Sequence, residues 1–479
     1  MRLLEGGVFN SEVLKDSVRR INQLGYFKPL EKGEAIQVDK TPGQDGKVDV
    51  KLKLEEQNRN QLTFGAGVSQ YEGFFGQLTF QTANFMGRGE TLSVSMTGGS
   101  RTQNYQLGFS EPFLFDRNIT GGFDIYKRSL QFIGYYTQKS TGTNFTFGFP
   151  VADFARMFVT YSYQSVGVSD LNEALLDPSC VVAARGCATV NINDLSRISP
   201  TALDSLRRNP FLFDSYLIGS NGNRTISKVS PSYVFNTIDN PIFPTSGRRI
   251  TLASDLGGLG GNTSYLKPTM EGIWYHRQSA RTSFGGRAQF QYIKPYRGTT
   301  TLPVFERLFL GGEYSIRGYD IRSVGPTVPN SQIVLGGNKS LLFNAEQNIN
   351  IAGPVRLIFF YDAGQVRDTG EAFALKEDIK EIVKAATPLL NDPLQTVTLN
   401  PCTVQPDGTC LVAPVQINVT GQRSAFKSST GAEIRFFMPV LNVPFRLIFA
   451  ANPQRAGVLD NNLRAAKRFT FKFAVGSTF

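Results

Sequence analysis

The sequence is poor in the residues on which most catalytic and metal-binding sites depend. Its 479 residues include one histidine, His276, and four cysteines. A single histidine excludes multi-histidine zinc sites and leaves one candidate base for Ser-His-Asp catalysis. The Gly-x-x-x-x-Gly-Lys-Ser/Thr loop that binds nucleotide phosphates is also missing. We therefore expect no enzyme activity, no cofactor and no metal.

Long apolar runs are missing as well. No stretch approaches the roughly 18 residues that a membrane-spanning helix needs. Yet charged residues make up only 19% of the chain, and it holds 47 glycines and 38 phenylalanines. Strands that alternate lipid-facing and lumen-facing residues produce no apolar run. The sequence thus excludes an α-helical membrane protein and leaves a transmembrane β protein open.

The formal net charge of +11 raises the question of nucleic-acid binding. Residues 1–60 are nearly balanced, with 11 basic and 10 acidic residues, so the excess lies in residues 61–479. It forms no compact Lys/Arg run there. We interpret it as contact with anionic outer-membrane lipid or as pairing inside the lumen, and expect no nucleic-acid partner.

The cysteines form two close pairs, Cys180 with Cys187 and Cys402 with Cys410, each inside a long polar stretch. Without histidine partners this spacing favours local disulfides in an oxidising compartment over a metal site, with free thiols as the alternative. Met1 is followed by neither a basic nor an apolar signal-peptide region, so we expect the protein to be either cytoplasmic or a truncated or mature form of a longer chain. The strand pattern described below favours truncation.

Residues 1–60 read as a small α/β module. Asn10 or Ser11 is a suitable cap for a helix that Gly25 ends, and 48–55 alternate apolar and charged residues as a half-buried strand does.

From residue 61 to 479 the pattern has period two, with Thr, Ser, Gln and Gly on the polar face. The segments begin near residues 62, 75, 90, 103, 119, 136, 154, 223, 248, 264, 280, 338, 355, 427, 445 and 468. An even number of segments, many close to 9–11 residues long, is typical of an outer-membrane barrel. We predict a mainly β protein with a 16-stranded antiparallel transmembrane β-barrel; a soluble multi-sheet protein is the alternative.

Long connections alternate with tight turns. The long ones are 169–222, 294–337 and 364–426. Outer-membrane barrels have short turns on the periplasmic side, so both chain ends and the first module should lie there and both cysteine pairs at the cell surface. Within the third connection one apolar stripe predicts a helix over the barrel mouth; a helix that lies on the membrane or docks a partner is the alternative. Its members are Ala372, Leu375, Ile379, Ile382, Val383, Ala386 and Leu390.

The second long connection contains Arg317, followed by Gly318 and Tyr319. A guanidinium on a tight backbone is a fixed planar fork that suits a carboxylate. Strand parity places Glu346 and Asp362 on the lumen side of two later strands. Arg317 is therefore expected to pin its loop inside the barrel by pairing with one of them; a solvated loop arginine is the alternative.

These motifs resemble the BamA family of outer-membrane assembly factors. Residues 316–319 resemble its Val-Arg-Gly-Phe/Tyr loop. Residues 360–364, which end on Gly364, resemble its Phe-x-Asp-x-Gly strand, and Glu346 matches its inward glutamate. Residues 11–27 and 48–56 are similar to part of the periplasmic POTRA domain that precedes the barrel. Residues 70–73 and 84–89 are similar to the family's first two hairpins. The 364–426 connection is longer than the resemblance leads us to expect.

The C-terminal segment is a second candidate site. Phe469, Phe471 and Phe473 alternate with inward residues that include Gly476, and the chain ends on Phe479. This resembles the β-signal of outer-membrane proteins, which an assembly machine reads by strand addition.

The resemblance implies that residues 1–60 are the C-terminal part of a POTRA domain and that 61–479 form the barrel. It implies an insertase that folds β-barrel clients into the outer membrane through a seam between the first and last strands, with periplasmic lipoprotein partners. A two-partner secretion pore is the alternative within the fold. An outer-membrane enzyme using His276, which sits beside Trp274 where an aromatic belt is expected, and a passive porin are less favoured.

Overall fold

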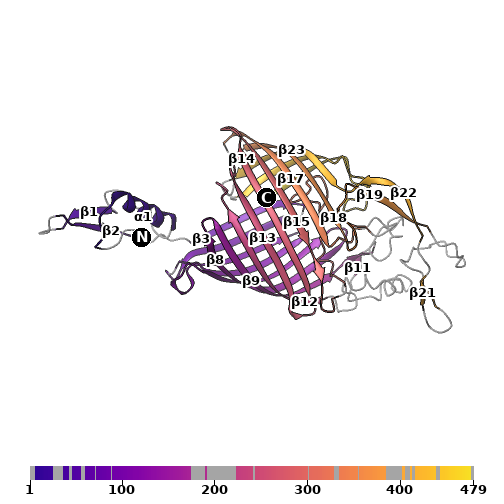
Figure 1. The fold of residues 1–479 in the computed structure, drawn as a ribbon, viewed down its shortest axis with the longest axis horizontal. Helices are drawn as coiled ribbons and strands as arrows, with labels where there is room; N and C mark the ends of the chain where they lie inside the picture. Colours follow the sequence, from indigo (N-terminus) through magenta and orange to yellow (C-terminus); the bar gives the residue numbers. More distant parts are fainter. Residues whose placement is uncertain are drawn as a thin grey trace.

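The structure is a computed structural model in which most of the chain is described (Figure 1). The described residues are 6–24, 36–41, 46–55, 60–70, 72–87, 89–173, 189–190, 223–240, 243–299, 301–327, 334–353, 355–383, 402–404, 410–412, 416–438 and 443–475.

The first module has the predicted helix and a two-stranded hairpin. Helix α1 (Ser11–Leu24) begins where the Asn10 side chain accepts hydrogen bonds from the backbone N–H groups of Glu12 and Val13, at 2.9 and 3.4 Å. Strands β1 (Ile36–Lys40) and β2 (Val48–Leu52) pair antiparallel. Figure 1 shows these elements beside the barrel at one of its ends.

The rest of the chain is dominated by an antiparallel barrel. Its first seven strands are β3 (Asn60–Ser69), β4 (Gly73–Phe85), β5 (Glu90–Gly99), β6 (Thr102–Glu111), β7 (Thr120–Phe132), β8 (Tyr136–Ala152) and β9 (Ala155–Ser169). The others are β12 (Asn223–Asn236), β13 (Gly247–Gly261), β14 (Tyr265–Arg277), β15 (Thr282–Tyr292), β16 (Lys294–Pro295), β17 (Lys339–Ala352), β18 (Val355–Arg367), β23 (Lys427–Met438), β24 (Val443–Ala451) and β25 (Phe469–Val475).

The two-residue β16 continues β15, since both pair with β14, so the barrel has sixteen strands. The predicted fold class is confirmed, and each predicted segment begins within two residues of an observed strand. In the strand order β25 closes onto β3. Among described residues these two strands approach each other over a much shorter length than any other neighbouring long strands of the barrel. We call this junction the seam.

Alternation along the strands gives the barrel an apolar outer face. On β3 and β4 the exposed residues include Leu62, Phe64 and Phe74, whereas the facing Gly67 and Phe75 point inward. The lumen wall of β4 to β9 is polar. Gln77 donates to Thr79 at 3.1 Å, the hydroxyls of Thr146 and Thr160 lie 3.0 Å apart, and Arg128 donates to Asn104 at 3.0 Å. Within the described residues, no helix is long and apolar enough to cross a membrane.

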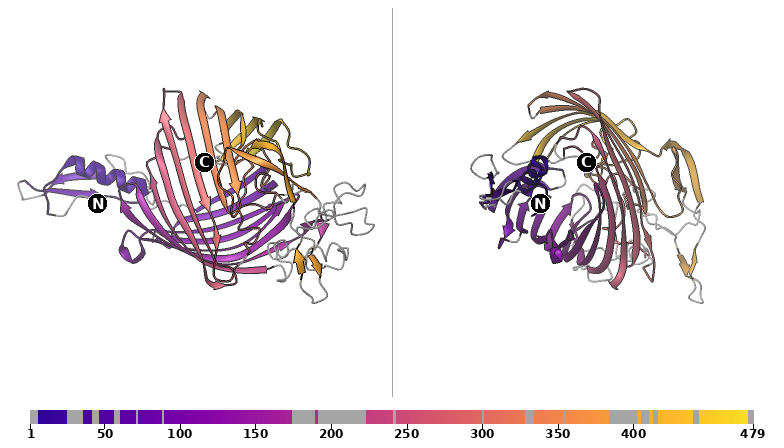
Figure 2. Two further views of the ribbon diagram at one scale, coloured as in Figure 1. Left: turned by 45° about the vertical axis from the view of Figure 1, so that its right-hand side comes forward. Right: turned by 60° about the vertical axis from the view of Figure 1, so that its left-hand side comes forward.

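Three small sheets lie at the end of the barrel opposite helix α1 (Figures 1 and 2). They belong to the first and third long connections and are formed by β10 (Leu171–Asn172) with β11 (Thr189–Val190), β19 (Lys376–Val383) with β22 (Gln416–Ser424), and β20 (Cys402–Val404) with β21 (Cys410–Val412). At the other end, a short 3-10 helix, η1 (Leu114–Asp116), lies in the turn between β6 and β7.

The helix predicted in the third connection is wrong over its described part. Residues Lys376–Val383 form strand β19, which pairs antiparallel with β22. Ile379, Ile382 and Val383 are β-branched and favour extended backbone. In addition, β19 and β22 prolong the β18–β23 pair outward, so a partner strand satisfies its backbone groups. Ala386 and Leu390 lie outside the described residues.

Candidate functional site in the barrel lumen

The connection between β16 and β17 folds back into the barrel, which we call the lumen loop (residues 296–338). Its apolar residues join side chains from the barrel wall in one buried cluster. The cluster contains Val166, Ile226, Tyr265, Ile293, Leu302, Leu308, Leu310, Ile316, Tyr319, Val324, Leu342, Val366, Val458 and Ala466. The loop is therefore a packed part of the interior, because burying these side chains removes them from water.

Arg317 lies at the inner end of the lumen loop with its side chain fully buried. Its Nε and Nη2 donate to the two carboxylate oxygens of Asp362 at 2.8 and 2.7 Å, and its backbone N–H adds a bond of 3.1 Å. Nη1 donates to Glu346 at 2.7 Å. The guanidinium also lies 3.9 Å from the ring centroid of Phe360. Both expected carboxylates are thus within reach at once.

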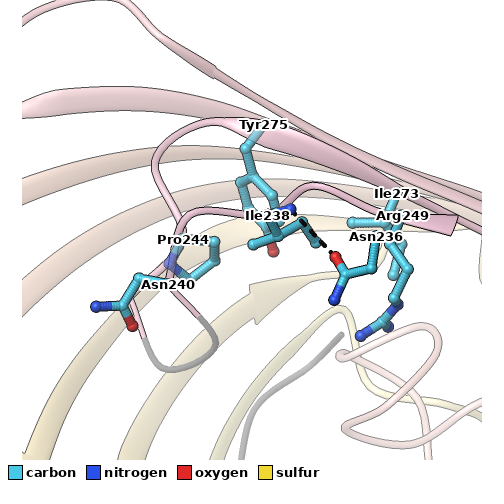
Figure 3. A pocket seen from close by; sticks show the side chains of 7 residues that line it. All are labelled: Asn236, Ile238, Asn240, Pro244, Arg249, Ile273 and Tyr275. Atoms are coloured by element: carbon cyan, nitrogen blue, oxygen red, sulfur yellow. Dashed lines mark hydrogen bonds between the residues drawn. The ribbon is translucent and has the colours of Figure 1, made fainter. Parts of the chain in front are cut away.

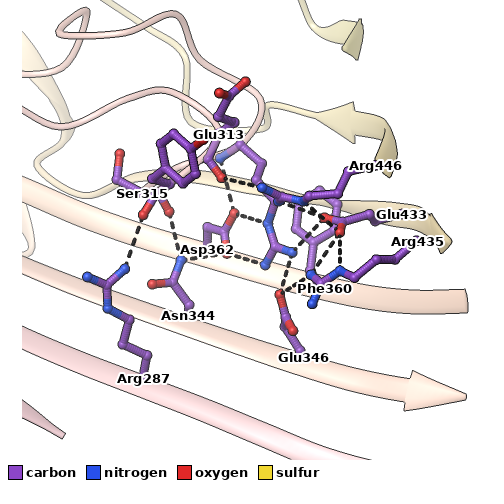
Figure 4. Close-up of polar contacts among 12 residues, drawn as sticks. Arg287, Glu313, Ser315, Asn344, Glu346, Phe360, Asp362, Glu433, Arg435 and Arg446 are labelled. Atoms are coloured by element: carbon purple, nitrogen blue, oxygen red, sulfur yellow. Dashed lines mark hydrogen bonds and ion pairs between the residues drawn. The ribbon is translucent and has the colours of Figure 1, made fainter. Parts of the chain in front are cut away.

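Three further charges complete the site, and the sequence reading missed them. Glu433 on β23 accepts from Arg317 at 3.2 Å and from Arg446 on β24 at 2.8 and 2.9 Å. Arg435 donates to Glu433 at 2.9 Å. With Arg317, Glu346 and Asp362 these residues make a buried cluster of three guanidinium groups and three carboxylates, which we call the lumen charge cluster (Figure 4). The alternation of side chains along β23 and β24 could have placed these three residues on the lumen side.

The cluster has zero net charge and few unused hydrogen bonds. Burial by itself lowers the pKa of Arg317, but the facing carboxylates of Asp362 and Glu346 outweigh it and raise the pKa above its ordinary value. Asn344 donates to Asp362 and to the backbone oxygen of Ser315, both at 2.7 Å. Because a buried charge is tolerated only when it is paired and hydrogen-bonded, this arrangement fixes the loop in one position.

The glycines beside these charges are required by space. A Cβ at Gly318 would lie 1.7 Å from Oδ1 of Asn452 and 2.5 Å from Oγ of Ser429. The Gly318 carbonyl also accepts hydrogen bonds from Asn452 at 2.9 Å and Thr470 at 3.2 Å. A Cβ at Gly364 would lie 2.6 Å from Leu310 of the loop. A larger side chain at either position would require these neighbouring groups to shift.

Tyr319 and the C-terminal strand occupy different surfaces. Tyr319 is buried, and its hydroxyl donates to the backbone oxygen of Ser428 at 3.2 Å. Phe469 and Phe471 are exposed on the outer face, and Phe473 lies beside Phe445 with ring centroids 5.7 Å apart. Gly476 and Phe479 lie outside the described residues.

The cysteine pairs remain predictions. Cys180 and Cys187 lie outside the described residues, and for Cys402 and Cys410 only the backbone is described. Cys402 opposes Val412 and Cys410 opposes Val404 in the β20–β21 ladder.

The candidate base His276 lies on β14. His276 is exposed, and it follows the outward-facing Trp274 by two residues on β14, so it shares the outer face. A cavity of about 240 Å³ opens at the turn end of β12 to β14 (Figure 3). It is lined by Asn236, Ile238, Asn240, Pro244, Arg249, Ile273 and Tyr275. This lining has no nucleophile beside a base. Over the described ranges, no group of three His, Cys, Asp or Glu could hold a metal ion.

Comparison with known proteins agrees with this geometry. The Omp85 superfamily domain matches residues 84–479. The chain is 24% identical over 388 residues to an outer membrane protein assembly factor BamA from Nitratidesulfovibrio vulgaris, which covers 80% of this chain and 43% of the relative. BamA from Haemophilus ducreyi lacking POTRA domains 1–3 has a similar fold, with a TM-score of 0.66 and 18% identity. The match covers 99% of this chain and 80% of the BamA chain. CdiB from Acinetobacter baumannii shares the fold at a TM-score of 0.50 and 10% identity. The match covers 99% of this chain and 69% of the CdiB chain. The chain spans less than half the length of the curated BamA relatives it matches.

Proposed function

Because the chain belongs to the Omp85 superfamily, we propose that it is the barrel part of an outer-membrane assembly factor that folds and inserts β-barrel proteins. The barrel and the relatives indicate the outer membrane as its location. The relatives matched over most of this chain are named assembly factors, which supports the same activity here. The clients would be unfolded outer-membrane β-barrel proteins.

The seam supplies the physical basis of the activity. A strand that enters hydrocarbon with unpaired N–H and C=O groups loses several kcal/mol per group. A barrel that parts between β3 and β25 offers such a strand a paired edge while it enters. Among the described residues these two strands approach each other over the shortest length of all neighbouring long barrel strands, which supports the seam as the place where the barrel opens. Folding of the client then supplies the free energy, and no nucleotide is consumed.

In this proposal the lumen charge cluster holds the lumen loop against β17, β18, β23 and β24. Arg317, Gly318 and Tyr319 place the loop, and Glu346, Asp362 and Gly364 receive it. The strands nearest the seam on the C-terminal side thereby keep a fixed geometry while the seam itself moves. This contribution is one of specificity, since buried ion pairs add little net stability.

We assign residues 1–60 to the C-terminal part of a periplasmic POTRA domain and 61–479 to the barrel. Strands β1 and β2 form a two-stranded sheet whose edges would accept client or lipoprotein segments by strand addition. Phe469, Phe471 and Phe473, with Gly476 and Phe479, would form the β-signal by which the chain is itself inserted.

The observation that carries the proposal is the bidentate Arg317–Asp362 pair in a barrel of this family. We expect Arg317→Ala in the full-length protein to lower the levels of many outer-membrane barrels several-fold, measured by quantitative proteomics of the outer membrane. Arg128→Ala is the matched control, because Arg128 also faces the lumen but bonds to Asn104 and Gln106. Loss of one exported protein with normal barrel levels would instead support a two-partner secretion pore. Unchanged levels of both would contradict the role of the pair.

A further inference from the structure

The lumen loop touches both strands of the seam through a second set of polar contacts, separate from the lumen charge cluster. On the first side, Gln70 directly follows β3. Its side-chain nitrogen donates to Asp320 of the loop at 2.5 Å, and its backbone N–H donates to Glu313 at 3.2 Å. The end of the first barrel strand is thus bonded to the loop twice.

On the other side, Lys472 of β25 points to the same place. Its ammonium donates to the Gln70 side-chain oxygen at 3.0 Å, to Asp320 at 3.1 Å and to the backbone oxygen of Tyr319 at 2.5 Å. The Lys472 side chain is only 11% exposed. Gln70, Asp320 and Lys472 therefore form a closed triangle in which each residue is bonded to the other two.

A neighbouring contact ties the loop to the end of the same strand. The Tyr314 hydroxyl donates to the backbone oxygen of Val475 at 3.1 Å. Burial alone would raise the pKa of Asp320, but Lys472 and the backbone N–H of Asn461 outweigh it, and the pKa is lowered. Asp320 is consequently ionised at neutral pH, and its bond to Lys472 is charge-assisted.

We propose that Gln70, Asp320 and Lys472 form a clasp that holds the seam closed from the lumen side. Over the residues that the structure describes, β3 and β25 approach each other only along a short length, so a few charge-assisted bonds contribute a large share of the seam's closure. Arg317 fixes the lumen loop to the barrel wall, so Asp320 keeps its position between the two strands that separate. Opening the seam requires either Gln70 after β3 or Lys472 on β25 to break its bond with Asp320. Displacement of Asp320 would break both bonds at once.

This inference goes beyond the proposed function, and its test needs no client. Spin labels at Val68→Cys on β3 and Phe471→Cys on β25 face outward, away from the triangle. The protein carries serine at the four native cysteines and is first shown to fold by its heat-modifiable gel mobility. Pulsed electron paramagnetic resonance in lipid nanodiscs then measures the distance across the seam.

With the native triangle we expect one dominant short distance. Asp320→Asn and Lys472→Gln should each raise the ratio of long to short distances about tenfold, the shift expected when one charged hydrogen bond is lost. The control is Glu306→Gln, which removes a carboxylate of the same loop that bonds to Tyr265 and Lys267 instead. It should leave the distribution as in the parent protein.

The exchanged pair Asp320→Lys with Lys472→Asp keeps both charges and should return the distribution toward the short distance. Unchanged distances in both single variants would overturn the proposal. So would an equal broadening in Glu306→Gln, because the effect would then be a general release of the loop. An exchanged pair as broad as the single variants would also overturn it, since the charge pair would not be the cause.

Discussion

Replacing Arg317 with methionine removes one positive charge from a buried cluster whose charges otherwise cancel. The cluster then holds the two remaining guanidinium groups of Arg435 and Arg446 against three carboxylates. Of its three hydrogen bonds from Arg317, Asp362 loses the two from the side chain, and Glu346 loses its bond of 2.7 Å. The bond of 3.1 Å from the Arg317 backbone N–H to Asp362 remains in the variant.

The magnitude follows from this asymmetry. Breaking a buried ion pair by removing one partner costs about 3–5 kcal/mol, because the other charge is left uncompensated. We expect Arg317→Met to lower the free energy of unfolding by that amount. Asp362→Asn alone should also destabilise the barrel, since it leaves one guanidinium in excess. The double variant restores zero net charge, so its cost should be well below the sum of the two.

The assay is urea-dependent unfolding in detergent micelles, followed by the fraction of protein that keeps its folded gel mobility. The four proteins of the double-mutant cycle give a coupling free energy directly. A coupling near zero, with the two single costs simply adding, would refute the reasoning that the pair stabilises by mutual neutralisation. An Arg317→Met variant as stable as the parent would refute the premise that the cluster needs its charge balanced.

Three other predictions concern separate sites. Gly318→Ala should destabilise the barrel by about 1–3 kcal/mol through overpacking, and adding Asn452→Ala should recover part of this in the same urea assay, because Asn452 gives the closest contact. Burial alone would raise the pKa of Asp239, but hydrogen bonds from Thr245 and neighbouring N–H groups lower it to about 2. Protection of the β12–β13 turn from hydrogen exchange should therefore be complete above about pH 4 and lost toward pH 2. Asp239→Asn should remove this pH dependence. Glu377→Gln should loosen the β19–β22 hairpin, since Glu377 pairs with Arg367, Arg423 and Lys427; faster exchange of that hairpin alone would support this, and unchanged exchange would contradict it.

The strands were predictable because their information is local. Period-two alternation and turn residues mark each barrel strand within a few residues, so all sixteen starts agree with the structure. The Arg317 environment was predictable in part, because Glu346 and Asp362 lie on strands whose lumen-facing parity is clear. Parity says which face a side chain occupies and nothing about which other side chains reach it.

The remaining partners required three-dimensional information. Glu433 lies 116 residues from Arg317, and Arg446 lies further along the chain, so no local pattern joins them. The helix predicted around Ile379 failed for a related reason. A spacing of three and four residues fits a helix, but the partner strand β22 is about 40 residues away and decides the conformation.

The burial of the lumen charge cluster shields its ion pairs from the salt of the surrounding medium. An outer membrane faces a medium whose ionic strength the cell does not control, and exposed ion pairs weaken as salt rises. Arg317, Glu346, Asp362 and Glu433 are almost completely removed from solvent. Mobile ions cannot reach between them, so the position of the lumen loop should be the same in dilute and in saline surroundings. In the proposed function, the seam therefore opens beside a lumen loop whose position does not change with the salt concentration of the medium.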